Sequence, residues 1–98
     1  MSLTSKQRAH LRSLANTMET ILYIGKEGIS PNTVKQAYDA LEARELIKCG
    51  VQRGAPLDAK EACQSLCEQT GAEPVQCIGS RFVIYRPSRD KQKITLDS

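Results

Sequence analysis

The part of the chain best suited to bind a ligand is the run Gly25-Lys26-Glu27-Gly28, in which two glycines flank two charged residues. Glycine lets the backbone approach a phosphate closely, and the lysine ammonium adds a positive charge. Ser30-Pro31 follows and is typical of a helix start, with serine as the cap and proline in the first turn. Because the N-terminal end of a helix favours negative charge, the sequence predicts an anion-binding turn here.

The same run also has a purely structural interpretation, because a tight strand-to-helix turn needs glycines that can adopt positive φ. The run matches neither the P-loop, whose lysine is followed by serine or threonine, nor the Rossmann fingerprint. Glu27 would repel phosphate unless its side chain points away. We expect Gly25, Lys26, Glu27 and Gly28 to form the binding turn, with the Glu27 carboxylate directed elsewhere.

Cysteine is the other residue type that could hold a ligand, at Cys49, Cys63, Cys67 and Cys77. Cys63 and Cys67 are expected on one face of a helix, and Cys49, Cys77 and His10 could in principle converge with them. A structural zinc site needs four ligands at suitable spacing, however, and the chain has no C-x-x-C. We interpret the cysteines as small buried hydrophobes and expect neither metal nor cofactor. No apolar leader precedes them, so we expect reduced thiols and a cytoplasmic protein.

The chain offers no arrangement of side chains that predicts catalysis. His10 is a single histidine on a polar helix, and no serine or cysteine nucleophile has an evident base. There is no H-E-x-x-H motif and no isolated pair of carboxylates in an apolar segment. We therefore expect a protein that is not an enzyme and has no small-molecule substrate.

Charge is unevenly distributed along the chain. Residues 1–35 and residues 74–98 each carry five basic and two acidic side chains, whereas residues 36–73 carry four basic and seven acidic. If the two ends meet in space, the fold has a basic side suited to a nucleic acid. An ordinary mixed-charge surface is the alternative. Beside the glycine turn, the candidate RNA contacts are Lys6, Arg8, Arg12, Lys35, Arg81 and Arg86.

Caps and periodicity predict three helices. Thr4 with Gln7, Ser30 with Pro31, and Asp58 with Glu61 mark the three helix starts, and Gly71 marks the end of the last helix. The expected buried stripes are Leu11, Leu14, Ala15 and Met18 in the first helix, Val34, Ala37, Tyr38 and Leu41 in the second, and Ala59, Ala62, Cys63 and Leu66 in the third.

Four short apolar segments predict strands: Thr20–Ile24, Glu45–Val51, Pro74–Ile78 and Arg81–Arg86. Gly79-Ser80 is typical of a type II′ hairpin turn between the last two strands. The order α-β-α-β-α-β-β predicts an α/β fold with a four-stranded mixed sheet packed with helices. We expect one domain over residues 1–88 and a polar tail over residues 89–98. The few aromatic residues disfavour a surface of several stacked rings.

Five stretches together resemble a known family: residues 3–8, 11–15, 24–29, 40–48 and 79–87. In this order they resemble the YhbY-like proteins, which are bacterial stand-alone CRM domains. The resemblance implies a fold like the C-terminal domain of translation initiation factor three, and RNA binding through a GxxG turn that maps to Gly25–Gly28. Bacterial members are associated with precursors of the large ribosomal subunit, and plant relatives with group II intron splicing. Glu27, Cys49 and Cys77 depart from the family's pattern.

These observations lead to one functional hypothesis and one alternative. We expect a monomeric RNA-binding protein that binds rRNA in precursors of the large subunit and has no membrane segment. The alternative is a protein-interaction module of the translation machinery, which would use the acidic side of the helix that begins at Asp58.

Overall fold

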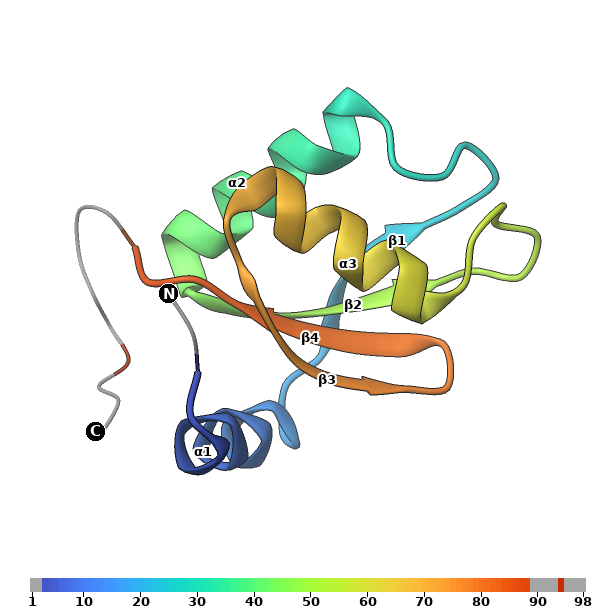
Figure 1. Cartoon of the computed structure of the whole chain (residues 1–98). Helices are drawn as coiled ribbons and strands as arrows, with labels where there is room; N and C mark the ends of the chain where they lie inside the picture. Colours follow the sequence, from blue (N-terminus) through green and yellow to red (C-terminus); the bar gives the residue numbers. More distant parts are fainter. Residues whose placement is uncertain (1–2, 89–93, 95–98) are drawn as a thin grey trace.

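A computed structural model describes residues 3–88 and Ile94 (Figure 1). The elements are α1 (Ser5–Ala15), β1 (Thr20–Ile24), α2 (Pro31–Arg44), β2 (Leu46–Val51), α3 (Ala59–Thr70), β3 (Glu73–Ile78) and β4 (Arg81–Tyr85). Their order is the predicted one. The predicted tail, residues 89–98, lies outside the described residues except for Ile94.

Each helix begins at its predicted cap. All three caps form a capping box. The side chain of the N-cap residue accepts the backbone N–H of the third helical residue, and the side chain of that third residue accepts the backbone N–H of the N-cap. The pairs are Thr4 with Gln7, Ser30 with Thr33, and Asp58 with Glu61. A capping residue of this kind contributes about 1 kcal/mol. The helix starts are therefore fixed by local sequence.

Three strand boundaries differ from the prediction by a single residue. β2 begins at Leu46, because Glu45 caps the end of α2 with a φ of 66° and cannot continue a strand. β3 begins at Glu73, one residue before the predicted start. β4 ends at Tyr85, so Arg86 lies just beyond the sheet. Gly71 ends α3 in the left-handed conformation, as predicted.

The sheet is mixed, with the strand order β1-β2-β4-β3. β1 and β2 are parallel, whereas β4 runs antiparallel to both β2 and β3. Gly79 has a φ of 58° and Ser80 does not have a positive φ, which fits the predicted type II′ turn. The turn after β1, the loop after β2 and the hairpin turn therefore lie at one end of the sheet (Figure 1).

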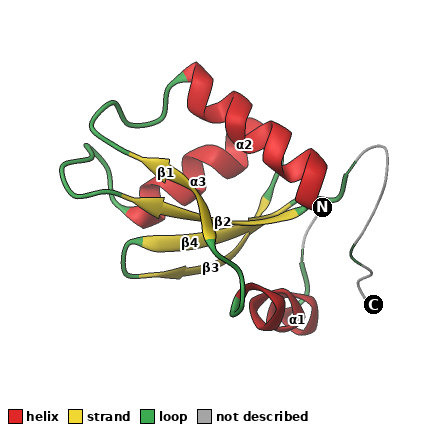
Figure 2. Cartoon of the chain, turned by 180° about the vertical axis from the view of Figure 1, so that it is seen from behind, coloured by secondary structure: helices red, strands yellow, loops and turns green. Residues whose placement is uncertain are grey.

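The helices cover the two faces of the sheet unequally. α2 and α3 pack on one face and α1 lies on the other (Figure 2). The larger core lies under α2 and α3 and includes Leu41, Ile47, Leu66 and Phe82. The smaller core joins α1 to the opposite face through Leu11, Ala15, Leu46, Val75 and Tyr85.

The predicted stripe of the first helix is wrong at Leu14, which is 39% exposed. Among the described helices, α1 is the one that packs on this face, and its residues Leu11 and Ala15, four apart, point into the core. A single helix on an open face buries a narrow stripe. The stripe predicted for α3 is confirmed in full.

The four cysteines are free thiols, and they differ in burial. Cys49 and Cys63 are core residues as predicted, and burial raises the pKa of Cys49 to about 12. Cys67 is half-buried. Cys77 is exposed, which corrects its interpretation as a core residue: it lies on edge strand β3. Within residues 3–88, no group of three potential ligands is placed to share a metal ion. No described helix is long and apolar enough to cross a membrane.

Candidate nucleic-acid interface

The Gly25–Gly28 turn presents its two charged residues at its tip. The Gly28 N–H donates to the Gly25 carbonyl oxygen at 3.0 Å, and the side chains of Lys26 and Glu27 are exposed. Gly28 has a φ of 68°, as the structural interpretation of the turn requires. The structural interpretation is thus satisfied, and it leaves Lys26 accessible to an anion.

The turn is held against the loop that follows β2. The Gln52 N–H donates to the Ile24 carbonyl at 2.8 Å. A side chain at Gly25 would meet the Gln52 side-chain oxygen at 2.9 Å, and one at Gly28 would meet Pro56 Cγ at 3.0 Å. Gly28 is therefore needed for close packing against Pro56, whereas the Gln52 side chain beside Gly25 is flexible and can move.

The start of α2 has few free backbone donors. Pro31 has no N–H, and the N–H groups of Ser30 and Thr33 donate to each other's side-chain oxygens. Among the described residues no hydrogen bond uses the Asn32 N–H, which remains available together with the helix dipole. Lys26 must consequently supply most of the attraction for an anion at this turn.

A shallow hollow of about 340 Å³ lies between the turn and the first turn of α2. Its lining is polar and includes Tyr23, the Gly25–Gly28 turn, Asn32, Thr33 and Gln36. Backbone amides, hydroxyls and amide side chains are groups that can hydrogen-bond phosphate and sugar oxygens. The hollow is open to solvent and lined by polar groups, so part of a nucleic-acid backbone could lie in it.

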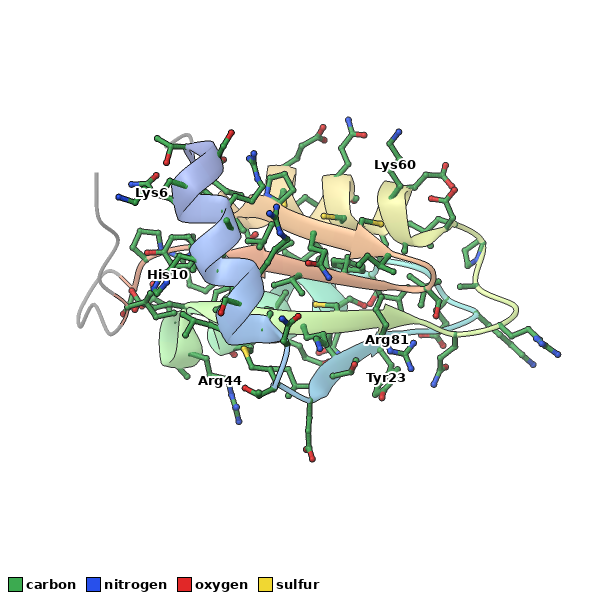
Figure 3. All side chains as sticks on the ribbon, turned by 90° about the horizontal axis from the view of Figure 1, so that it is seen from below. Lys6, His10, Tyr23, Arg44, Lys60 and Arg81 are labelled. Carbon is green, nitrogen blue, oxygen red and sulfur yellow. The ribbon has the colours of Figure 1, made fainter. Side chains whose placement is uncertain are left out.

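The basic side chains of α1 have different surroundings. Arg8 Nε donates to the Pro74 carbonyl at 3.1 Å and thereby ties α1 to β3. Lys6 and Arg12 are exposed. Figure 3 places Lys6 at the end of α1 that is distant from Tyr23 and Arg81. The structure therefore does not bring all of the predicted contacts into one cluster.

Two further candidates have intramolecular partners. Arg86, predicted to contact RNA, is buried: its Nη2 donates to Glu42 at 2.9 Å, and its guanidinium lies 4.5 Å from the centre of the Tyr38 ring. It does not belong to the exposed basic surface. Lys35 forms an exposed pair with Asp39 at 3.0 Å, which offsets its charge but leaves it accessible. The remaining candidate, Arg81, is exposed and lies over the ring of Tyr23 (Figure 3).

The sequence analysis missed Arg53. This exposed residue lies in the loop after β2, the loop against which the glycine turn packs. Arg53 belongs to the segment of net negative charge, so the charge count obscured it. The carboxyl ends of neighbouring parallel strands lie at one edge of a sheet. The predicted strands end at residues 24 and 51, so this rule would have placed Arg53 beside the glycine turn.

The two basic ends of the chain do meet in space. α1 packs on β3 and β4, which belong to the last segment of the domain. Of the seven acidic residues in residues 36–73, Glu61 and Glu68 lie on α3 and Glu73 lies at the start of β3. Of the basic residues of that last segment that the structure describes, Arg81 is exposed and Arg86 is buried.

These features define a small α/β domain in which a GxxG turn, with exposed basic residues at the same end of the sheet, precedes the second helix. Residues 3–86 match the CRS1/YhbY (CRM) domain, and the chain belongs to this family. The family resemblance and the α/β fold predicted from the sequence are thus confirmed.

Several relatives match over nearly their whole length. YqeI of Bacillus subtilis, named a probable RNA-binding protein, is 38% identical over 94 residues, which cover 96% of this chain and 98% of that protein. An RNA-binding protein of Haemophilus influenzae is 32% identical over 90 residues, which cover 91% of this chain and 90% of that protein. The solution structure of SAV1595 from Staphylococcus aureus is similar with a TM-score of 0.80 at 48% identity, covering 98% of this chain and 100% of that one.

Proposed function

We propose that this chain is an RNA-binding protein without enzymatic activity, and that the Gly25–Gly28 turn binds RNA phosphate. The observation that carries the proposal is the exposed Lys26 on a turn that the neighbouring loop holds rigidly at the start of α2. The names of the relatives from Bacillus subtilis and Haemophilus influenzae support RNA as the ligand.

In this mechanism Lys26 and the Asn32 N–H bind one phosphate, and the dipole of α2 adds to the attraction. Arg53, after β2, and Arg81, at the start of β4, lie at the same end of the sheet as the turn and contact neighbouring phosphates or sugars. Glu27 is exposed at the tip of the turn, so its carboxylate can point into solvent. Lys6 and Arg12 extend the surface along α1 and contact a longer RNA.

The salt dependence of binding tests this mechanism. Removing one lysine that binds a phosphate should reduce the slope of log affinity against log salt by about 0.7 for single-stranded RNA. We expect Lys26→Ala to weaken binding of a labelled single-stranded RNA and to reduce the slope by about this amount. Lys60→Ala, an exposed lysine on α3, is the matched control and should change neither. RNA affinity unchanged by both Lys26→Ala and Arg12→Glu would contradict the proposal.

We further propose that the RNA is rRNA in precursors of the large ribosomal subunit and that the protein acts in the cytoplasm as a monomer. The membership of the chain in the CRM-domain family supports this target. Crosslinking in cells, followed by sequencing of the attached RNA, should recover mainly large-subunit rRNA. Fragments distributed over unrelated transcripts would overturn the target while leaving RNA binding intact.

A further inference from the structure

One row of residues crosses all four strands on the face of the sheet that α1 shares. Tyr23 on β1 lies opposite Gly50 on β2, Gly50 lies opposite Arg81 on β4, and Arg81 lies opposite Ile78 on β3. Side chains alternate along a strand, and the neighbours Ile24 and Phe82 point into the core under α2 and α3. The row therefore faces away from those helices.

α1 covers this face only in part. Farther along the strands, Leu46, Val83 and Tyr85 are buried in the core beneath α1. At the row itself Tyr23 is 49% exposed and Ile78 is 65% exposed. Viewed from below, Tyr23 and Arg81 lie side by side on the part of the sheet that α1 leaves open (Figure 3). The row therefore has an exposed aromatic ring and an exposed isoleucine on a part of the sheet that α1 does not cover.

Gly50 determines how Arg81 lies on this surface. A side chain at Gly50 would meet Arg81 Nη1 at 2.9 Å, so the guanidinium occupies the space above the glycine. The guanidinium carbon is 5.6 Å from the centre of the Tyr23 ring, and Nη1 donates to Ser80 Oγ at 3.1 Å. The missing side chain thus lets a planar cation lie across β2 and over the partly exposed ring of Tyr23.

The charge around the row suits RNA. The row itself contains no acidic residue, and Lys48 follows on β2 in the next position on this face. Tyr23 also lines the hollow at the Gly25–Gly28 turn, so the open face is continuous with the proposed phosphate site. A strand of RNA whose phosphate lies at Lys26 would have its adjacent base beside Tyr23.

We propose that Tyr23 and Arg81 form a stacking platform for one unpaired base of the bound RNA. This proposal rests on the proposed function and adds to it the kind of RNA that is bound, a single-stranded segment. Bases in a duplex are stacked on each other and cannot lie on a protein ring, whereas bases of single strands stack on tyrosine rings and on guanidinium planes. Of the other aromatic residues, Phe82 and Tyr85 are buried and Tyr38 lies under Arg86, so the platform accepts a single base.

A set of variants at position 23 tests the platform, with the intact chain and a short single-stranded RNA that contains 2-aminopurine. Stacking quenches 2-aminopurine fluorescence, so we expect quenching with the wild type and with Tyr23→Phe. Tyr23→Leu keeps an apolar side chain on the strand but removes the ring. It should lose the quenching and about 5- to 100-fold in affinity, with an unchanged salt slope. The same substitution should not alter the affinity for a blunt RNA duplex.

The two proposals fail in different ways. If Lys26→Ala weakens binding but Tyr23→Leu preserves both affinity and quenching, the platform is wrong and the phosphate site stands. If Tyr23→Leu leaves RNA binding intact but abolishes association with ribosomal particles, the row binds a protein and the platform is again wrong. If neither variant weakens RNA binding, both proposals are wrong.

Discussion

Arg86 and Glu42 form an ion pair of 2.9 Å that joins the residue after β4 to the second half of α2. The two side chains are 8% and 25% exposed, and the guanidinium also lies on the ring of Tyr38. Ser88 strengthens the arrangement, because its hydroxyl donates to the other oxygen of Glu42 at 3.0 Å. The contact fastens the end of the sheet to α2, so Arg86 has a structural role.

Replacing Arg86 should therefore affect stability and leave RNA affinity unchanged. Arg86→Ala removes the ion pair with the partly buried Glu42 carboxylate, and such a loss costs about 3 kcal/mol. Urea unfolding should show this decrease, while the folded fraction should bind RNA with wild-type affinity. Lys35→Ala removes an exposed pair and should change stability by less than about 1 kcal/mol. An Arg86→Ala protein of normal stability and weakened RNA affinity would place Arg86 on the binding surface after all.

Gly28→Val should destabilise the protein by roughly 1–3 kcal/mol. The backbone at Gly28 has a φ of 68°, and a side chain there would meet Pro56 at 3.0 Å. Gly54→Val is the matched control, because Gly54 also has positive φ, at 94°, but no atom of the described residues lies within 4 Å of the added carbon. In urea unfolding, Gly28→Val should therefore lose more stability than Gly54→Val. Equal losses would show that the contact with Pro56 does not matter.

The starts of the helices could be predicted because their determinants are local. Ser30 and Asp58 cap helices through partners three residues away, and Gly71 ends α3 through its own backbone conformation. The exposure of Leu14 could not be predicted in this way. The helical spacing places Leu14 near Leu11, but how far the sheet extends beneath α1 depends on packing between distant parts of the chain.

The candidate site shows the same division between local and distant causes. The turn conformation at Gly28 follows from its own sequence, whereas the contrast between Arg81 and Arg86 depends on alternation along β4. They are five positions apart, an odd number, so they lie on opposite sides: Arg81 faces solvent beside α1, and Arg86 faces α2. Counting the alternation from Phe82 would have assigned Arg86 to the side of α2. Its partner, Glu42, is 44 residues away and is visible only in the fold.

Glu45→Gln should destabilise the protein by about 2 kcal/mol. The buried Glu45 carboxylate accepts the Ser88 N–H at 2.6 Å with one oxygen and the Ile94 N–H at 2.7 Å with the other. The glutamine side chain has one acceptor oxygen and one NH2 group, so either the Ser88 amide or the Ile94 amide would face the NH2 group and lose its acceptor. Hydrogen exchange should become faster at the Ser88 and Ile94 amides and stay unchanged at amides in α1. Unchanged hydrogen-exchange rates at the Ser88 and Ile94 amides would show that the hydrogen bonds to Glu45 do not protect these two amides.

Stability should fall as the pH rises above about 9, and Cys49 should account for part of the decrease. Burial raises the pKa of Cys49 from 9.0 to about 12, so the folded protein keeps this proton over a range in which the unfolded chain releases it. The unfolded state then binds fewer protons than the folded state, and the free energy of unfolding decreases with pH by up to about 1.4 kcal/mol per unit. Well below pH 9 the thiol is protonated in both states, so Cys49 does not make stability depend on pH there.

A comparison with Cys49→Ala isolates this contribution from those of lysine and tyrosine residues. The variant loses core packing at every pH, because Cys49 is fully buried, but it has no thiol to ionise. Urea unfolding at about pH 8 and about pH 10.5 should therefore show a smaller decrease for Cys49→Ala than for the wild type. Parallel decreases in the two proteins would mean that the thiol of Cys49 ionises equally easily in the folded and unfolded states.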